Sequence, residues 1–106
     1  MKREDVYKLI DGERDYQNLK WNIATTSDSK RSLEEWFMYI EDYVNEAKHI
    51  LSRETRKSRQ TADIRAGNIM RKVAAMAVFA MEQHNVEQRT DTRKEDWKEI
   101  VTPTPD

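Results

Sequence analysis

One group of side chains with possible chemistry follows the pattern E-R-x-x-Q-x-x-x-W. Its members are Glu13, Arg14, Gln17 and Trp21. Helical spacing places Glu13 and Gln17 on the same stripe as nearby apolar residues, so two polar side chains interrupt an apolar face. The group is either a candidate ligand-binding set or a set of helix-surface charges beside one buried tryptophan.

A second group is acidic and consists of Glu41, Asp42 and Glu46. On a helix, Asp42 lies nearly opposite Ile40 and is expected to face solvent. Glu41 and Glu46 flank the apolar stripe from opposite sides and can reach a neighbouring helix. We therefore take Glu41 and Glu46, but not Asp42, as candidate ligand-binding residues.

A third group is basic: Arg71 and Lys72 stand where a strongly apolar run begins. Charged groups at such a position need partners, because an isolated buried charge is very costly. One expectation is that they pair with Glu41 or Glu46 or extend to the surface. The other is that they line a shared pocket and bind an anionic ligand.

The chain lacks the residues that several common kinds of catalytic or metal-binding site require. The chain contains no cysteine and only two glycines, Gly12 and Gly67, so it has no thiol nucleophile and no glycine-rich phosphate loop. His49 and His84 have no second histidine or cysteine three or four residues away. We assign no catalytic residue, no metal ligand and no cofactor.

The elements that must position these groups are helices. The chain has 106 residues, 37% of them charged, with only two glycines and two prolines, which indicates long helices and few turns. Periodicity predicts helices over about 3–20, 33–52 and 62–83. Ser32 and Glu35 form a capping box for the second helix. The predicted fold class is all-α, a three- to four-helix bundle, assembled as a homo-oligomer.

The remaining segments are predicted to connect or follow the helices. We expect a loop over 21–30 and a solvated loop or frayed helix end over 53–60. A short C-terminal helix is expected around Trp97, Ile100 and Val101. Residues 1–101 are then a single helical domain, and 102–106 a disordered tail.

Self-association is predicted from the third helix. Between Val73 and Met81 it reads VAAMAVFAM, nine consecutive apolar residues, which is apolar all round. Three helices in a short chain cannot surround a fourth element on every side, whereas a partner subunit can. We therefore expect a homo-dimer or tetramer.

Charge and hydropathy restrict the other partners. A basic stretch over 53–72 could bind nucleic acid through the side chains Arg53, Arg56, Lys57, Arg59 and Arg65. The net charge of −1 and the absence of an aromatic residue within that stretch argue against it. No apolar run approaches the roughly 20 residues of a membrane span, so we expect a cytoplasmic protein.

Taken together, three segments resemble the small MazG-like proteins of bacteriophages and bacteria, relatives of the all-α nucleotide pyrophosphohydrolases. The segments are ERDYQNLKW, EEWFMYIEDYVNEA and VAAMAVFAME, within residues 9–82. The resemblance implies an obligate helical dimer or tetramer with a nucleotide pocket between helices. The chain is also similar to uncharacterised phage proteins with ERDYQ and RKVAAMAV…MEQH, which implies a phage origin and location in the host cytoplasm.

The resemblance also implies a Mg²⁺ site built from E-x-x-E on the second helix and E-x-x-D on the third. Here Glu46 fits the second acid, but Tyr43 occupies the first position. On the third helix the expected pair falls on Ile69 and Lys72, next to Arg71. Positive charge at that place would oppose Mg²⁺ binding.

The function expected from these observations is that of a non-catalytic MazG-like oligomer, a phage accessory protein that binds a nucleotide or a host protein. One alternative is an active Mg²⁺-dependent nucleoside triphosphate pyrophosphohydrolase with an altered metal site that uses Glu13, Glu41, Asp42 and Glu46. The other is a nucleic-acid-binding protein that uses the basic stretch.

Overall fold

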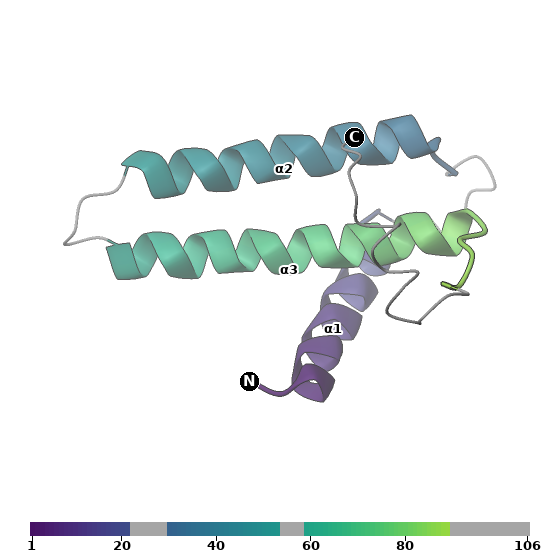
Figure 1. The fold of residues 1–106 in the computed structure, drawn as a ribbon, viewed down its shortest axis with the longest axis horizontal. Helices are drawn as coiled ribbons and strands as arrows, with labels where there is room; N and C mark the ends of the chain where they lie inside the picture. Colours follow the sequence, from purple (N-terminus) through teal and green to yellow (C-terminus); the bar gives the residue numbers. More distant parts are fainter. Residues whose placement is uncertain (22–29, 54–58, 90–106) are drawn as a thin grey trace, which may run out of the picture.

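The described part of the chain is entirely helical. A computed structural model describes residues 1–21, 30–53 and 59–89 and contains, within these ranges, three helices and no strand. They are α1 (Arg3–Trp21), α2 (Leu33–Arg53) and α3 (Arg59–Gln83), shown in Figure 1. The predicted all-α class is confirmed.

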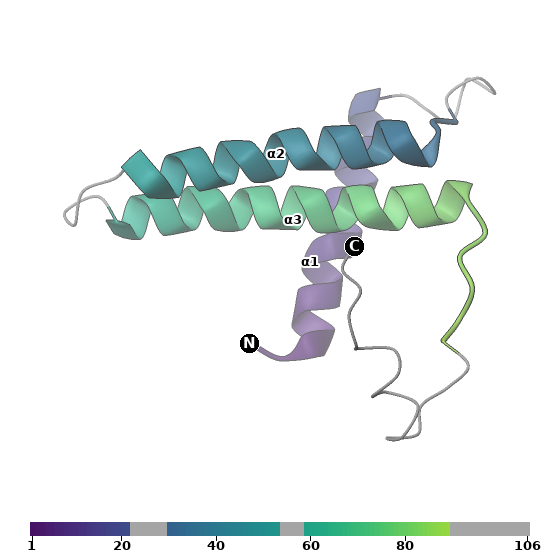
Figure 2. The ribbon, with the colours of Figure 1, turned by 45° about the horizontal axis from the view of Figure 1, so that its top comes forward.

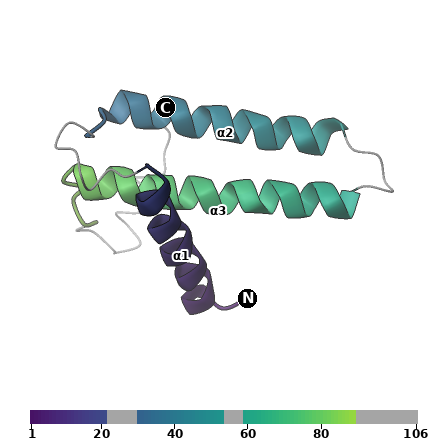
Figure 3. The same ribbon diagram turned by 180° about the vertical axis from the view of Figure 1, so that it is seen from behind.

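Helices α2 and α3 form an antiparallel hairpin, and α1 crosses it. The two long helices lie side by side in both Figure 1 and Figure 2. The α1 backbone approaches α3 but not α2, and its N-terminal half projects away from the hairpin, as the rear view in Figure 3 also shows. The predicted three- to four-helix bundle and its assembly as a homo-oligomer stay predictions. None of the described helices is long and apolar enough to cross a membrane.

The predicted capping box at the start of α2 is confirmed. The Glu35 backbone N–H donates to Ser32 Oγ at 3.1 Å, and the Ser32 N–H donates to Glu35 Oε1 at 2.9 Å. Two backbone donors that the first turn leaves free are thereby satisfied. The cap fixes where α2 begins.

Ser32→Ala is expected to lower the free energy of unfolding by about 1 kcal/mol, the usual loss for an N-cap side chain. Urea denaturation followed by circular dichroism measures it. Ser52→Ala is the matched control, because the Ser52 hydroxyl donates to the His49 carbonyl in an exposed last turn. A larger effect at Ser52 than at Ser32 would contradict the capping role.

Two predicted boundaries are wrong. Trp21 ends α1 instead of beginning a loop, and α3 begins at Arg59 rather than Ala62. Arg59 forms an ion pair with Asp63 at 3.2 Å and donates to the Leu51 carbonyl at 3.1 Å. These contacts extend the helix into charged sequence that has no apolar face of its own.

The other predicted connections and the predicted C-terminal helix and tail lie in 22–29, 54–58 and 90–106, outside the described residues.

Two apolar clusters hold the helices together. The first combines Trp36 of α2 with Met76, Phe79 and Ala80 of α3, and Trp21 of α1 packs against it. The second lies towards the other end of the hairpin and is formed by Ile50, Ala62 and Ile69. Most of the hydrophobic stabilisation of the fold comes from these contacts.

The apolar run of α3 is covered on two sides only. Ala75, Met76, Phe79 and Ala80 are buried, whereas the Met81 side chain is 54% exposed. The hairpin partner and α1 therefore account for much of the run. The remaining side of α3, which includes Met81, is exposed and lies next to α2.

Candidate functional site

The first predicted group is divided between structural contacts and a pocket. Glu13 is paired with Arg71, whose Nε donates to Glu13 Oε1 at 2.7 Å, and Arg71 Nη1 also donates to Asn68 Oδ1 at 3.1 Å. The Glu13 side chain is only 9% exposed. The predicted pairing of Arg71 with Glu41 or Glu46 is wrong. Arg71 lies on the face of α3 that meets α1, whereas both glutamates are exposed on α2.

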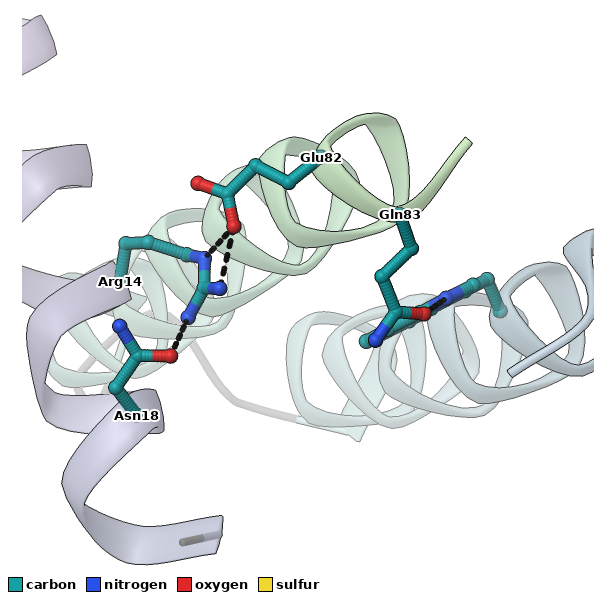
Figure 4. Close-up of polar contacts among 5 residues, drawn as sticks. Arg14, Asn18, Glu82 and Gln83 are labelled. Carbon is teal, nitrogen blue, oxygen red and sulfur yellow. Dashed lines mark hydrogen bonds and ion pairs between the residues drawn. The ribbon is translucent and has the colours of Figure 1, made fainter. Parts of the chain in front are cut away.

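Arg14 is buried between α1 and α3 and is fully engaged with protein groups. Its Nη1 donates to Asn18 Oδ1 at 2.6 Å, its Nε donates to Glu82 Oε1 at 2.9 Å, and Nη2 donates to the same Glu82 oxygen (Figure 4). The guanidinium carbon lies 3.4 Å from the centre of the Phe79 ring. A planar cation stacked on an aromatic face and paired with a carboxylate stabilises the α1–α3 contact. This arrangement gives Arg14 a structural role.

Gln17 differs from Arg14 because half of its amide has no partner. The residue is 3% exposed, and its Nε2 donates to the Lys72 backbone carbonyl at 3.3 Å. Its Oε1 is buried and accepts no hydrogen bond. An unpaired buried acceptor costs about 1–3 kcal/mol, so such a group calls for an explanation.

A cavity of about 210 Å³ lies where α1, α2 and α3 meet, and aromatic rings line most of it. Its lining residues are Trp21, Arg31, Trp36, Tyr39, Tyr43 and Met76. Next to it is a smaller space of about 20 Å³, which shares Trp21, Tyr43 and Met76 with the cavity and is also lined by Gln17. The smaller space is large enough for one water molecule or an amino group.

Cationic groups stand at both spaces. Lys72 and Lys20 line the smaller one, and the Lys72 ammonium lies 5.5 Å from the centre of the Tyr43 ring. Arg31 lines the larger one, with its guanidinium carbon 4.9 Å from the centre of the Tyr39 ring. Aromatic faces flanked by cations can hold a planar ligand that carries negative charge.

The position of Arg31 is fixed by the end of α3. Gln83 Oε1 accepts from the Arg31 backbone N–H at 3.0 Å and from Trp36 Nε1 at 2.9 Å. A ring nitrogen of His84, Nε2, lies 2.8 Å from the Arg31 carbonyl oxygen. These three contacts tie Arg31 and the first turn of α2 to the C-terminal end of α3 and the residue after it, so paired polar groups hold this border of the cavity.

The carboxylates of α2 do not converge with Glu13. Glu46 and Asp42 border an open hollow with Tyr39 and Tyr43, and Glu41 is not part of it. Over residues 1–21, 30–53 and 59–89, no group of three His, Cys, Asp or Glu side chains is placed to hold a metal ion. Among the described residues, Glu13 and the acids of α2 thus lie apart and do not form a shared carboxylate set for a Mg²⁺ ion.

The structure therefore gathers four predicted site residues around one pocket: Glu13, Gln17, Trp21 and Lys72. Arg71 joins them only through its pairing with Glu13, whereas Arg14, Glu41 and Glu46 lie elsewhere. Sequence reasoning missed the aromatic residues of α2. Tyr39 and Tyr43, four residues apart, were a usable signal because they widen the apolar face towards α1.

The basic stretch offers little additional information. Arg59 is paired with Asp63, Arg53 is exposed, and Arg56 and Lys57 lie outside the described residues. The nucleic-acid alternative stays a prediction.

No protein-family model, no curated protein and no solved structure matches this chain.

Proposed function

We propose that this protein binds a nucleotide in the aromatic pocket between α1, α2 and α3 and does not hydrolyse it. The observation that carries the proposal is the buried, unpaired Oε1 of Gln17, which lines the smaller space adjoining that pocket. An amide oxygen accepts hydrogen bonds, so the group that satisfies it must be a donor. The exocyclic amino or ring N–H group of a nucleobase is such a donor.

The walls favour a flat ring system. Trp21, Tyr43 and Tyr39 present aromatic faces, and a base stacked on such a face gains about 1–3 kcal/mol. The cavity of about 210 Å³ is smaller than the roughly 300–1,000 Å³ of sites that enclose a whole ligand. A base fits inside it, and a sugar and phosphate would extend outward.

The charges favour an anionic remainder. Lys72, Lys20 and Arg31 border the two spaces, and Lys72 forms no ion pair within the described part of the chain. Glu13, the carboxylate that lines the smaller space, is neutralised by Arg71. The border is therefore net positive and suits phosphate groups.

The same pairing supports the non-catalytic assignment. Phosphoryl-transfer sites depend on carboxylates that hold metal ions or position the attacking water. Here Glu13 is held by Arg71 at 2.7 Å, and Asp42 and Glu46 of α2 border a different hollow. The resemblance to MazG-like proteins is consistent with a nucleotide pocket between helices, and a phage accessory role extends this proposal.

Titration with a panel of nucleoside mono-, di- and triphosphates, followed by tryptophan fluorescence and calorimetry, tests the proposal. We expect saturable binding that weakens at least 10-fold in Gln17→Met and in Lys72→Met. Gln17→Met should keep the free energy of unfolding within about 1 kcal/mol of wild type, because it removes an unpaired acceptor along with one bond. Lys8→Met, on the exposed N-terminal half of α1, is the matched control and should bind normally.

Three results would overturn the proposal in different ways. Release of pyrophosphate from nucleoside triphosphates with Mg²⁺ or Mn²⁺, abolished in Glu46→Gln, would establish the hydrolase alternative. DNA binding with a steep salt dependence would establish the nucleic-acid alternative. If no nucleotide binds at millimolar concentration, a nucleotide is not the ligand. Pull-down from host lysate would then test for binding of a host protein.

A further inference from the structure

An apolar hollow of about 360 Å³ lies between α2 and α3, on the side of the hairpin that includes Met81. Its lining consists of four side chains from the N-terminal part of α2, three from the C-terminal part of α3, and Val86, and all eight are apolar. Phe37 is 68% exposed and Met81 is 54% exposed, so the described part of the chain leaves the hollow open to solvent. Apolar surface gathered in this way marks a place where another segment or molecule binds.

The chain itself leads from α3 into this hollow. Helix α3 ends at Gln83, and Val86, three residues further on, is one of the lining residues. The residues between them are held in place, because Gln83 Oε1 accepts from Trp36 Nε1 at 2.9 Å and His84 Nε2 lies 2.8 Å from the Arg31 carbonyl oxygen. The chain therefore leaves α3 beside the hollow and from a fixed point.

The sequence that follows the described residues contains a matching apolar group. Residues 87–96 read EQRTDTRKED and include no aliphatic or aromatic side chain. Trp97, Ile100 and Val101 come next, at positions i, i+3 and i+4, which share one face of a helix. Only one group of side chains after Val86 is therefore suited to an apolar hollow.

The length of the tether allows this group to reach the hollow. Eleven residue steps join Val86 to Trp97 and span at most about 36–40 Å, whereas α3 from Ala77 to its end is only about 9 Å long. A segment on a short flexible tether has an effective concentration in roughly the millimolar range at the surface beside it. A second copy or another protein at micromolar concentration would have to compete with it.

We propose that residues 97–101 of this chain cover the hollow, with Trp97 as the main contact because its indole has the largest apolar surface of the three. The segment would then lie against Trp36, which lines both the hollow and the aromatic pocket, and would support that wall of the pocket from outside. The inference does not rest on nucleotide binding, since neither Gln17 nor Lys72 lines the hollow.

Disulfide trapping in the full chain tests this proposal, because the chain has no cysteine of its own. Met81→Cys with Ile100→Cys places one thiol at the hollow and one in the segment. Met38→Cys with Ile100→Cys is the matched control, because Met38 is 64% exposed in the same part of α2 but does not line the hollow. At micromolar protein we expect the first pair to form an intramolecular disulfide roughly 10-fold faster than the control pair, and Trp97→Ser to abolish the difference.

Thermal unfolding is the second measurement. Trp97→Ser should lower the melting temperature by about 4–8 °C, the usual shift for a chain of this length when one apolar contact is lost, and Trp97→Phe should melt close to wild type. The shift should be the same at every protein concentration, because the contact lies within one chain.

Three outcomes would overturn the proposal. They are equal rates for the two cysteine pairs, a Trp97→Ser variant that melts with wild type, and disulfide-linked dimers in place of closed monomers, which would assign the hollow to a second copy. The nucleotide proposal is tested by Gln17→Met and Lys72→Met, which leave the hollow unchanged, so the two proposals fail separately.

Discussion

Phe79→Ala is expected to lower the free energy of unfolding by about 3–5 kcal/mol, the range for deleting a buried aromatic side chain. Phe79 is 4% exposed and touches all three helices. Its ring centre lies 5.1 Å from that of Trp36 and 6.1 Å from that of Trp21. The Arg14 guanidinium stacks on its face. The substitution therefore opens a cavity and also removes the surface on which a buried cation rests.

Denaturant unfolding measures this loss, with Val78→Ala as the matched control. Val78 is adjacent in sequence but only half-buried, so its loss should be about 1 kcal/mol. Similar losses for the two variants would show that the first cluster is not the centre of the fold. The tryptophan fluorescence of Phe79→Ala should also change, because both neighbouring rings lose a contact.

Glu82→Gln is expected to lower the free energy of unfolding by about 2 kcal/mol. Removing one partner of a buried ion pair leaves an uncompensated charge and can cost 3–5 kcal/mol, but the Glu82 side chain is 50% exposed and water reduces the effect. Arg14, with a side chain 10% exposed, could still donate to Asn18 and to the neutral amide oxygen of the glutamine, but it would lose its negatively charged partner. The destabilisation arises from Arg14 rather than from Glu82.

A double-mutant cycle distinguishes a loss of stability caused by the unpaired charge of Arg14 from one caused by Glu82 itself. Replacing Arg14 by methionine removes the buried charge at this contact, so Glu82→Gln in that background should cost much less, with a coupling of about 1–2 kcal/mol. Glu87→Gln, an exposed acid beyond α3, is the control and should change stability by less than about 0.5 kcal/mol. A Glu82→Gln effect of equal size with and without Arg14 would contradict the pairing.

The fold class and the three helices were predictable because their signals are local. The capping box of Ser32 and Glu35 and the apolar stripe of α2 depend on residues within a few turns of one another. The beginning of α3 was not predictable in this way. It depends on Arg59, which reaches across to the Leu51 carbonyl of α2, and on a pairing with Asp63 inside a stretch that has no apolar pattern.

The candidate site was predictable only in part, because its contacts join residues far apart in the chain. Helical spacing marked Gln17 as a polar group on an apolar face, and the structure buries it. Charge alone suggested that Arg71 pairs with Glu41 or Glu46, but the crossing of α1 over α3 supplies Glu13 instead. Spacing within one helix cannot determine which helix lies beside it.

The most direct test of the account is a nucleotide titration of ¹⁵N-labelled protein observed by NMR. We predict that the side-chain amide of Gln17 and the indole N–H of Trp21 shift together and saturate at one concentration. The exposed side-chain amide of Gln88 should stay still. Resonances that never move, or that move only away from the pocket formed by α1, α2 and α3, would contradict the claim that the unpaired oxygen of Gln17 awaits a ligand.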